Sequence, residues 1–151
     1  MPDPLYDLRT ARHDLPLLFA GQAQKETFVN ELAARVDALL HLAIESETAT
    51  PPATPVDGQS WLVGASPAGV WLGQSGTIAA RAAGNWLFLQ PTAGMTLLNK
   101  ATGQQIRYRS GWQAPAKPAL PSGGATSDAE ARTAIGAIIA VLVSAGIVPT
   151  S

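Results

Sequence analysis

Residues 84–112 read GNWLFLQPTAGMTLLNKATGQQIRYRSGW, in which short apolar runs alternate with glycine-containing turns. This spacing is typical of short strands joined by hairpins and lacks a helical period. The same character extends back to residue 56, and we expect strands at 60–63, 70–72, 77–81, 86–89, 95–99, 105–109 and Trp112. The turns between them are supplied by Asp57-Gly58, Gly84-Asn85, Thr102-Gly103 and Ser110-Gly111. The sequence therefore predicts a small antiparallel β module, either a barrel or a sandwich.

A helical period precedes the β module, between residues 21 and 46. Its apolar side chains follow steps of three and four: Val29, Leu32, Val36, Leu39 and Ala43. This stripe is typical of a helix that packs on another helix. Phe28, Leu40 and Ile44 widen the stripe, so packing on a β domain is equally compatible. The proline-rich run 48–55 excludes helix and predicts a linker.

A second proline- and glycine-rich stretch, residues 115–126, is expected to be an extended spacer before a C-terminal helix. Ser127 and Glu130 have the spacing of a capping box, and Gly146 with Pro149 marks a stop, which predicts a helix over 128–145. No charge follows Arg132 within this helix. Its apolar seam includes Ile135, Ile138 and Leu142.

This uncharged helix predicts burial against copies of itself. A membrane span is the alternative, but about 15 apolar residues fall short of the roughly 20 that a bilayer requires. Isoleucine along the seam favours a trimer or a higher assembly. The expected fold class is α+β, divided into an N-terminal arm and helix (1–47), the tryptophan-rich β module (48–114), the linker (115–126) and an oligomerisation helix (127–151).

Composition also favours assembly. Charged residues make up 14% of the chain, against about 25% in typical soluble domains. The few charges are uneven, with −4 over residues 1–47 and +3 over residues 48–114. A charge of +3 is too small to predict nucleic-acid binding. The first ten residues lack the apolar core of a secretory signal, and we expect no membrane association.

The sequence offers little for catalysis. A glycosidase needs two carboxylates, yet none lies between residues 58 and 127, and Asp57 is expected to form a turn. There is no cysteine, and His13 and His41 lie in no recognisable nucleophile or metal motif. We therefore expect no enzyme activity, no cofactor and no metal site.

The four tryptophans are expected mainly in the core, because aromatic rings supply much of the buried area of a small module. In an alternative interpretation, exposed rings stack on a sugar while arginines bind its carboxylates. The residues assigned to this glycan contact are Trp71, Trp86, Arg107, Tyr108 and Arg109.

Residues 15–26 read LPLLFAGQAQKE and continue to Asn30-Glu31 and to residues 37–39, DAL. Together with the proline-rich break and the tryptophan-rich segment, they resemble uncharacterised proteins encoded by phages, prophages and gene transfer agents of alphaproteobacteria. The resemblance implies a spike or fibre component of a phage-like particle, made in the bacterial cytoplasm and in contact with capsid or tail proteins. It also implies a role as base or adaptor, possible pentamers at a five-fold vertex, and host capsular polysaccharide as a ligand. A free-standing carbohydrate-binding module and a membrane-associated adaptor are the alternatives.

Overall fold

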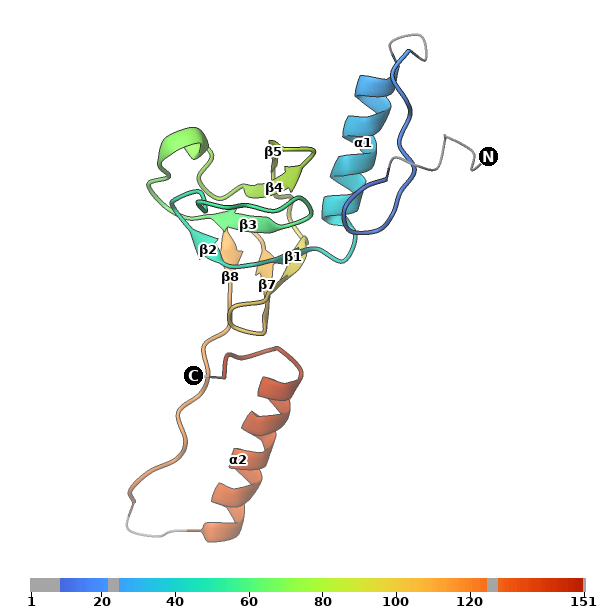
Figure 1. Ribbon diagram of the computed structural model, residues 1–151. Coiled ribbons are helices and arrows are strands. Elements are labelled where there is room, and N and C mark those ends of the chain that lie inside the picture. Colours follow the sequence, from blue (N-terminus) through green and yellow to red (C-terminus); the bar gives the residue numbers. More distant parts are fainter. Residues whose placement is uncertain (1–8, 22–24, 125–127, 151) are drawn as a thin grey trace. The chain divides into compact units, whose positions relative to one another are not determined.

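The computed structural model describes residues 9–21, 25–124 and 128–150, which contain two helices and eight strands in two sheets (Figure 1). The predicted α+β class with a small β module and a C-terminal helix is confirmed. Three sequence predictions fall outside the described residues: the N-terminus before Arg9, the QAQ part of the family motif, and Ser127 of the capping box. The chain divides into two compact units, Met1–Pro91 and Thr92–Ser151. This division falls inside the 48–114 segment that the sequence treats as one module.

The first unit contains one helix and five strands. Its elements are α1 (Glu26–Leu39), β1 (Ala43–Ile44), β2 (Glu47–Thr48), β3 (Ser60–Val63), β4 (Ile78–Ala82) and β5 (Asn85–Leu89). The sheet order is β2-β3-β4-β5, with antiparallel β3–β4 and β4–β5 pairs, as predicted. The β2–β3 pair is parallel, which the expectation of a purely antiparallel module missed. Thr48, assigned to the linker, therefore lies in a strand.

The predicted strand at 70–72 is wrong. Gly69–Trp71 forms one turn of 3₁₀ helix, in which the amide of Trp71 donates to the carbonyl of Ala68 at 3.1 Å. Gly69 has a φ of +59°, a conformation that glycine adopts without steric cost. The turn places the Trp71 ring in the core, where its exposed fraction is 0%. A continuous apolar run of three residues, here 70–72, does not distinguish such a turn from a short strand.

Side chains alternate between the two faces of this sheet. One face carries Trp61, Val63 and Ala79, which form a buried cluster with Trp71 and with the partly buried Trp86 and Phe88. The opposite face carries Ser60 on β3, Ala80 on β4 and Leu87 on β5, in adjacent register. The first face is filled by large rings. The second face carries small side chains at Ser60 and Ala80, next to the buried aliphatic row Leu62, Ile78 and Leu89.

Helix α1 ends seven residues before the predicted end at 46. Leu40 is already extended with a ψ of 123°, and His41 has a φ of +46°. After this turn, the chain follows a period of two instead of 3.6, so that Leu42 and Ile44 are both buried. Ala43 and Ile44, which the sequence placed on the helix, form β1.

The end of α1 is fixed by the chain segment that precedes the helix. The guanidinium of Arg12 donates to the carbonyls of Asp37, Ala38 and His41 at 2.8 to 3.0 Å. These carbonyls have no partner within a helix, and a cation is favourable at this end of the helix dipole. Arg12 therefore stabilises the end of α1 from outside the helix.

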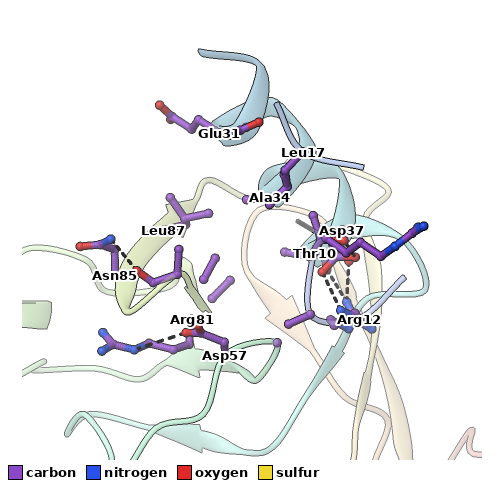
Figure 2. A pocket seen from close by; sticks show the side chains of 18 of the residues that line it. Thr10, Arg12, Leu17, Glu31, Ala34, Asp37, Asp57, Arg81, Asn85 and Leu87 are labelled. Carbon is purple, nitrogen blue, oxygen red and sulfur yellow. Dashed lines mark hydrogen bonds and ion pairs between the residues drawn. The ribbon is translucent and has the colours of Figure 1, made fainter. Parts of the chain in front are cut away.

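The buried carboxylate of Asp37 binds the same segment (Figure 2). Its Oδ1 accepts hydrogen bonds from the Thr10 hydroxyl at 2.6 Å and from the amide of His13 at 2.7 Å. Its Oδ2 accepts one from the amide of Arg12 at 3.0 Å. Two turns of helix earlier, the Asn30 side chain bonds both the amide and the carbonyl of Leu18. Residues 9–18, here called the arm, are thus attached along α1.

The second unit contains β6 (Thr96–Asn99), β7 (Gln104–Tyr108), β8 (Trp112–Gln113) and helix α2 (Ala129–Ser144). The β6–β7 and β7–β8 pairs are antiparallel, close to the predicted strands. Helix α2 lies within one residue of the predicted 128–145 at each end. Its N-cap is Asp128, whose carboxylate accepts from the amide of Ala131 at 2.9 Å.

Both ends of the segment that carries α2 are attached to β7. The buried side-chain amide of Gln104 donates to the carbonyls of Pro115 and Ile147. The backbone amide of Gln105 donates to the carbonyl of Gly146 at 2.7 Å. Gly146 has a φ of +68°, and a Cβ there would lie 3.0 Å from the carbonyl oxygen of Gly103, so only glycine fits.

The predicted spacer is held along its length. Lys117 donates to the carbonyl of Thr150, and Arg132 of α2 donates to the carbonyls of Pro121 and Gly123. The described part of this segment is therefore attached to the helix that it was expected to separate from the β module.

Candidate functional site

Helix α1 turns its apolar stripe away from its own unit. Five large apolar side chains are between 39% and 78% exposed: Phe28, Val29, Leu32, Val36 and Leu39. At 100° per residue they occupy one side of the helix, with Leu32 near the centre. All four residues predicted for an α1 interface, Val29, Leu32, Val36 and Leu39, belong to this stripe.

The opposite side of α1 faces its own chain and is more polar. It carries Ala34 and Ala38 together with Asn30 and Asp37, whose side chains bind the arm. An amphipathic helix in a globular domain normally turns its apolar side to the core. In α1 this arrangement is reversed, and the apolar side is exposed.

Helix α2 exposes a second apolar surface. Ile138 is 60% exposed, Val141 and Ile135 are also exposed, and Leu142 is half-buried. Ile139 is the only residue that is buried along the whole of α2. The three residues predicted for this seam, Ile135, Ile138 and Leu142, are thus accessible to different degrees.

The five residues assigned to a glycan contact do not form one surface in the structure. Trp71 is fully buried, so its ring presents no surface to a sugar and its assignment is corrected. Trp86 lies 5.1 Å from Trp71 in an edge-to-face pair, and the guanidinium of Arg81 lies 5.1 Å from the centre of its ring. These two contacts stabilise the ring within the core cluster and occupy much of its surface.

Arg107, Tyr108 and Arg109 do not point to one side. Tyr108 pairs with Trp112 in the β7–β8 register, and their rings lie 5.2 Å apart in an edge-to-face arrangement. Arg107 and Arg109 together line a depression of about 630 Å³, with Gln105, Gln113 and Thr96 at its sides. The two arginines are both exposed. The second unit therefore presents a cationic depression without an aromatic platform.

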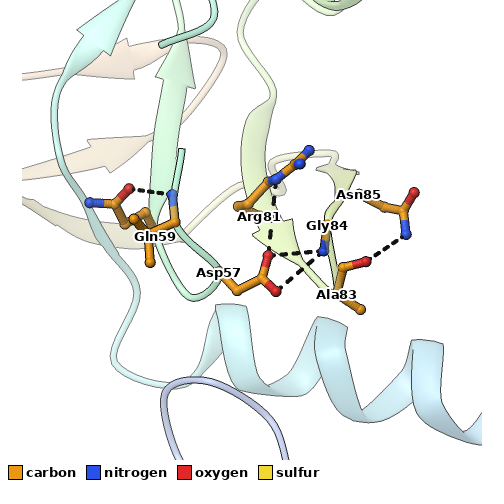
Figure 3. A network of polar contacts seen from close by, with 7 residues as sticks. Asp57, Gln59, Arg81, Ala83, Gly84 and Asn85 are labelled. Carbon is orange, nitrogen blue, oxygen red and sulfur yellow. Dashed lines mark hydrogen bonds and ion pairs between the residues drawn. The ribbon is translucent and has the colours of Figure 1, made fainter. Parts of the chain in front are cut away.

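Asp57 is part of a polar network that closes the β4–β5 hairpin (Figure 3). Its carboxylate accepts from the amide of Gly84 at 3.0 Å and lies 4.0 Å from the guanidinium of Arg81. Ala83 and Gly84 both have positive φ, as a two-residue hairpin turn of this hand requires. The turn is one residue earlier than the predicted Gly84-Asn85, and Asp57 stabilises it from outside the hairpin.

His13 and His41 are 28 positions apart in the sequence, yet their ring centres lie 6.0 Å apart beside the end of α1. The arm places the two rings side by side. Their separation in the sequence does not predict this contact. His13 also approaches the carbonyl of Leu40 at 3.2 Å. Among the described residues, no group of three or more metal-ligating side chains is formed.

Residues 29–113 match the family described as "Protein of unknown function (DUF2793)", over more than half of the chain. The chain belongs to the DUF2793 family. The match covers most of α1 and all eight strands, whereas the arm and α2 lie outside the DUF2793 region. No curated protein matches the chain.

Within the described ranges, no helix is long and apolar enough to cross a membrane. The two units carry opposite formal charges: residues 1–91 contain five basic and nine acidic side chains, and residues 92–151 contain five basic and two acidic ones. Charges of −4 and +3 are available for contacts with other molecules.

Proposed function

We propose that this protein is a non-catalytic structural subunit of a phage-like particle, which assembles into a spike or fibre base through α1 and α2. The observation that carries the proposal is the outward apolar stripe of α1. A contiguous exposed apolar surface of this kind marks an interaction site in soluble proteins. Because the stripe runs the length of a helix, a helix from another copy is the partner that complements it best.

The exposed surface of α2 supports the same proposal. Together the helices give each subunit two apolar surfaces, so that closed rings or bundles can form. A trimer is the expected assembly, and a pentamer is the alternative if the subunit sits at a five-fold vertex. The N-terminal motif resembles that of particle appendage proteins. This resemblance supports capsid or tail proteins as further partners of the assembly.

The proposal is tested by purifying particles from a producing culture and measuring the chain by quantitative mass spectrometry. We expect a fixed ratio of this chain to the major capsid protein, corresponding to several copies per particle. Particles from a strain that lacks the gene serve as the control and should contain none of it. Sedimentation of the isolated protein should give an oligomer. Particles that contain none of this chain, or an isolated protein that stays monomeric at micromolar concentration, would contradict the proposal.

Binding of an acidic polysaccharide is a second proposal, supported by the depression at Arg107 and Arg109. Guanidinium groups bind carboxylates through paired hydrogen bonds, so uronic acids fit this site better than neutral sugars. On an array of capsular glycans, the wild-type protein should bind acidic polysaccharides. The double variant Arg107→Ala/Arg109→Ala should lose this binding, and the control variant Lys25→Ala should retain it. Equal binding of neutral and acidic glycans would overturn it.

A further inference from the structure

A cavity of about 530 Å³ lies in the first unit, bordered by α1, the arm and the β4–β5 face of the sheet (Figure 2). Alanines line both sides, with Ala34 and Ala38 on α1 and Ala80 and Ala82 on β4. Leu17 of the arm and Leu87 of β5 complete the apolar wall. The cavity exists because these small side chains do not fill the space between helix and sheet. Its volume lies in the range of small-molecule sites.

Ser60 provides a polar group within this apolar wall. Its side chain is 1% exposed, it lines the cavity, and its hydroxyl has no hydrogen-bond partner among the described residues. Buried hydroxyls are nearly always hydrogen-bonded, because the bonds to water lost on burial must be replaced. A molecule within the cavity is the natural source of this missing bond.

The lining defines the chemistry of the occupant. It contains no aromatic residue, so a sugar or a nucleobase would find no ring to stack on. Three basic and three acidic side chains line the cavity: Arg9, Arg12, Arg81, Glu31, Asp37 and Asp57. Asp37 binds the arm, Glu31 is paired with Arg35 at 2.7 Å, and Asp57 lies 4.0 Å from Arg81. The lining is therefore balanced in charge and does not favour an ionic ligand.

We propose that this cavity binds a small, uncharged aliphatic molecule, with its apolar body against the alanines and a hydroxyl or carbonyl oxygen bonded to Ser60. This binding is independent of the assembly through α1, because the alanines and the outward stripe lie on opposite sides of the helix. The protein would then have both an assembly surface and a ligand site on one helix.

The test compares cyclohexanol with cyclohexane, which have similar rings and differ in the hydroxyl. Each is titrated into the full-length protein, and backbone amide resonances are followed by NMR. We expect saturable shifts of the Ala34, Ala80 and Ala82 amides, with cyclohexanol bound about tenfold more tightly because it bonds to Ser60. Ser60→Ala should remove this preference and leave cyclohexane binding unchanged.

Ala80→Leu fills the cavity and should abolish the binding of both probes, whereas Ala101→Leu, in the β6–β7 turn, should not affect it. The amide spectrum of each variant shows whether its fold is retained, and Ser60→Ala tests the proposal if Ala80→Leu does not fold. Absence of saturable shifts in the wild-type protein would overturn the proposal, as would an unchanged preference in Ser60→Ala. Loss of the oligomer in a folded Ala80→Leu variant would assign the cavity to a side chain of a neighbouring copy, and the small-molecule proposal would be wrong.

Discussion

Helices α1 and α2 are each anchored by an aspartate, but at opposite ends and by different means. Asp128 caps the start of α2 through an amide only three residues away. Asp37 lies in the last turn of α1, where a carboxylate is unfavourable for the helix dipole, and binds residues 24 to 27 positions away. One helix end is set by local sequence and the other by tertiary contacts.

This difference determines how each helix depends on its surroundings. Capping stabilises α2 wherever the helix lies, whereas α1 requires the arm to hold both its buried carboxylate and its last carbonyls. Both helices nevertheless leave large apolar side chains exposed. The anchoring residues of each helix are therefore separate from the apolar residues proposed for assembly, and substitutions can distinguish the two roles.

The largest effect is expected from Asp37→Ala. The carboxylate accepts three hydrogen bonds in a buried site, and its loss leaves the Thr10 hydroxyl and two amides without their acceptor. We expect the free energy of unfolding of the first unit to fall by about 4 kcal/mol. Urea unfolding followed by tryptophan fluorescence measures it. Asp37→Asn keeps one acceptor oxygen and should lose about half as much; equal stability of the alanine variant and the wild type would show that the arm does not anchor α1.

Leu32→Asp tests the apolar stripe of α1. Leu32 is 62% exposed within its own chain, so the fold of the subunit should be unchanged. In an assembly the new carboxylate is buried without a partner, at a cost of about 3 kcal/mol per subunit. Sedimentation should show a smaller species. Thr27→Asp, on the other side of α1, should keep the wild-type oligomer, and dissociation of both variants alike would indicate a general charge effect.

Ile138→Asp makes the same change in α2, where we expect a cost of about 2 kcal/mol per subunit because fewer large apolar residues surround it. The oligomer should shrink and the helical signal should fall, while tryptophan fluorescence stays near native. Thr133→Asp, on the far side of α2, serves as the control. Full retention of the oligomer by Ile138→Asp would place the assembly seam on α1 alone, and loss of tryptophan burial would show that α2 stabilises the core of the β strands.

Asp128→Ala should have the smallest effect, about 1 kcal/mol, because it removes a single N-cap bond at an exposed site. The helical circular dichroism signal on heating measures the loss, and Asp128→Asn, another good N-cap, should restore most of it. A loss as large as that of Asp37→Ala would contradict the distinction between a locally and a tertiarily anchored helix.

The same distinction explains which parts of the fold could be predicted from the sequence. The ends of α2 carry local signals, and its predicted bounds agree with the structure within one residue. The end of α1 could not be predicted, because the apolar steps continue through Ala43 and the contacts that stabilise the helix end come from the arm, far away in sequence. The β4–β5 and β6–β7 hairpins were predictable from their turns. The β3–β4 pair was not, because the strand expected at 70–72 lies between its two strands, and β2 pairs in parallel over a distance that no turn residue indicates.

The candidate sites were predictable to a lesser degree. The stripes on α1 and α2 follow from periodicity, which depends on sequence alone. The burial of Trp71 depends on a 3₁₀ turn that a glycine makes possible, and an aromatic ring gives the same signal in a core and on a surface. The cavity at Ser60 could not be found from the sequence, since it results from small residues on separate elements that meet only in the folded unit.

The attachment of both Pro115 and Ile147 to Gln104 has a consequence for the evolution of the chain. One glutamine side chain binds the point where the segment carrying α2 leaves β7 and the point where it returns. A segment whose two ends are fixed side by side is the kind of position where insertions and exchanges are tolerated. We expect natural variants to differ in length, and even in fold, between residues 116 and 146 while retaining Gln104. Recombination at this position would give the chain a new segment in place of α2 without redesigning the strands that carry it.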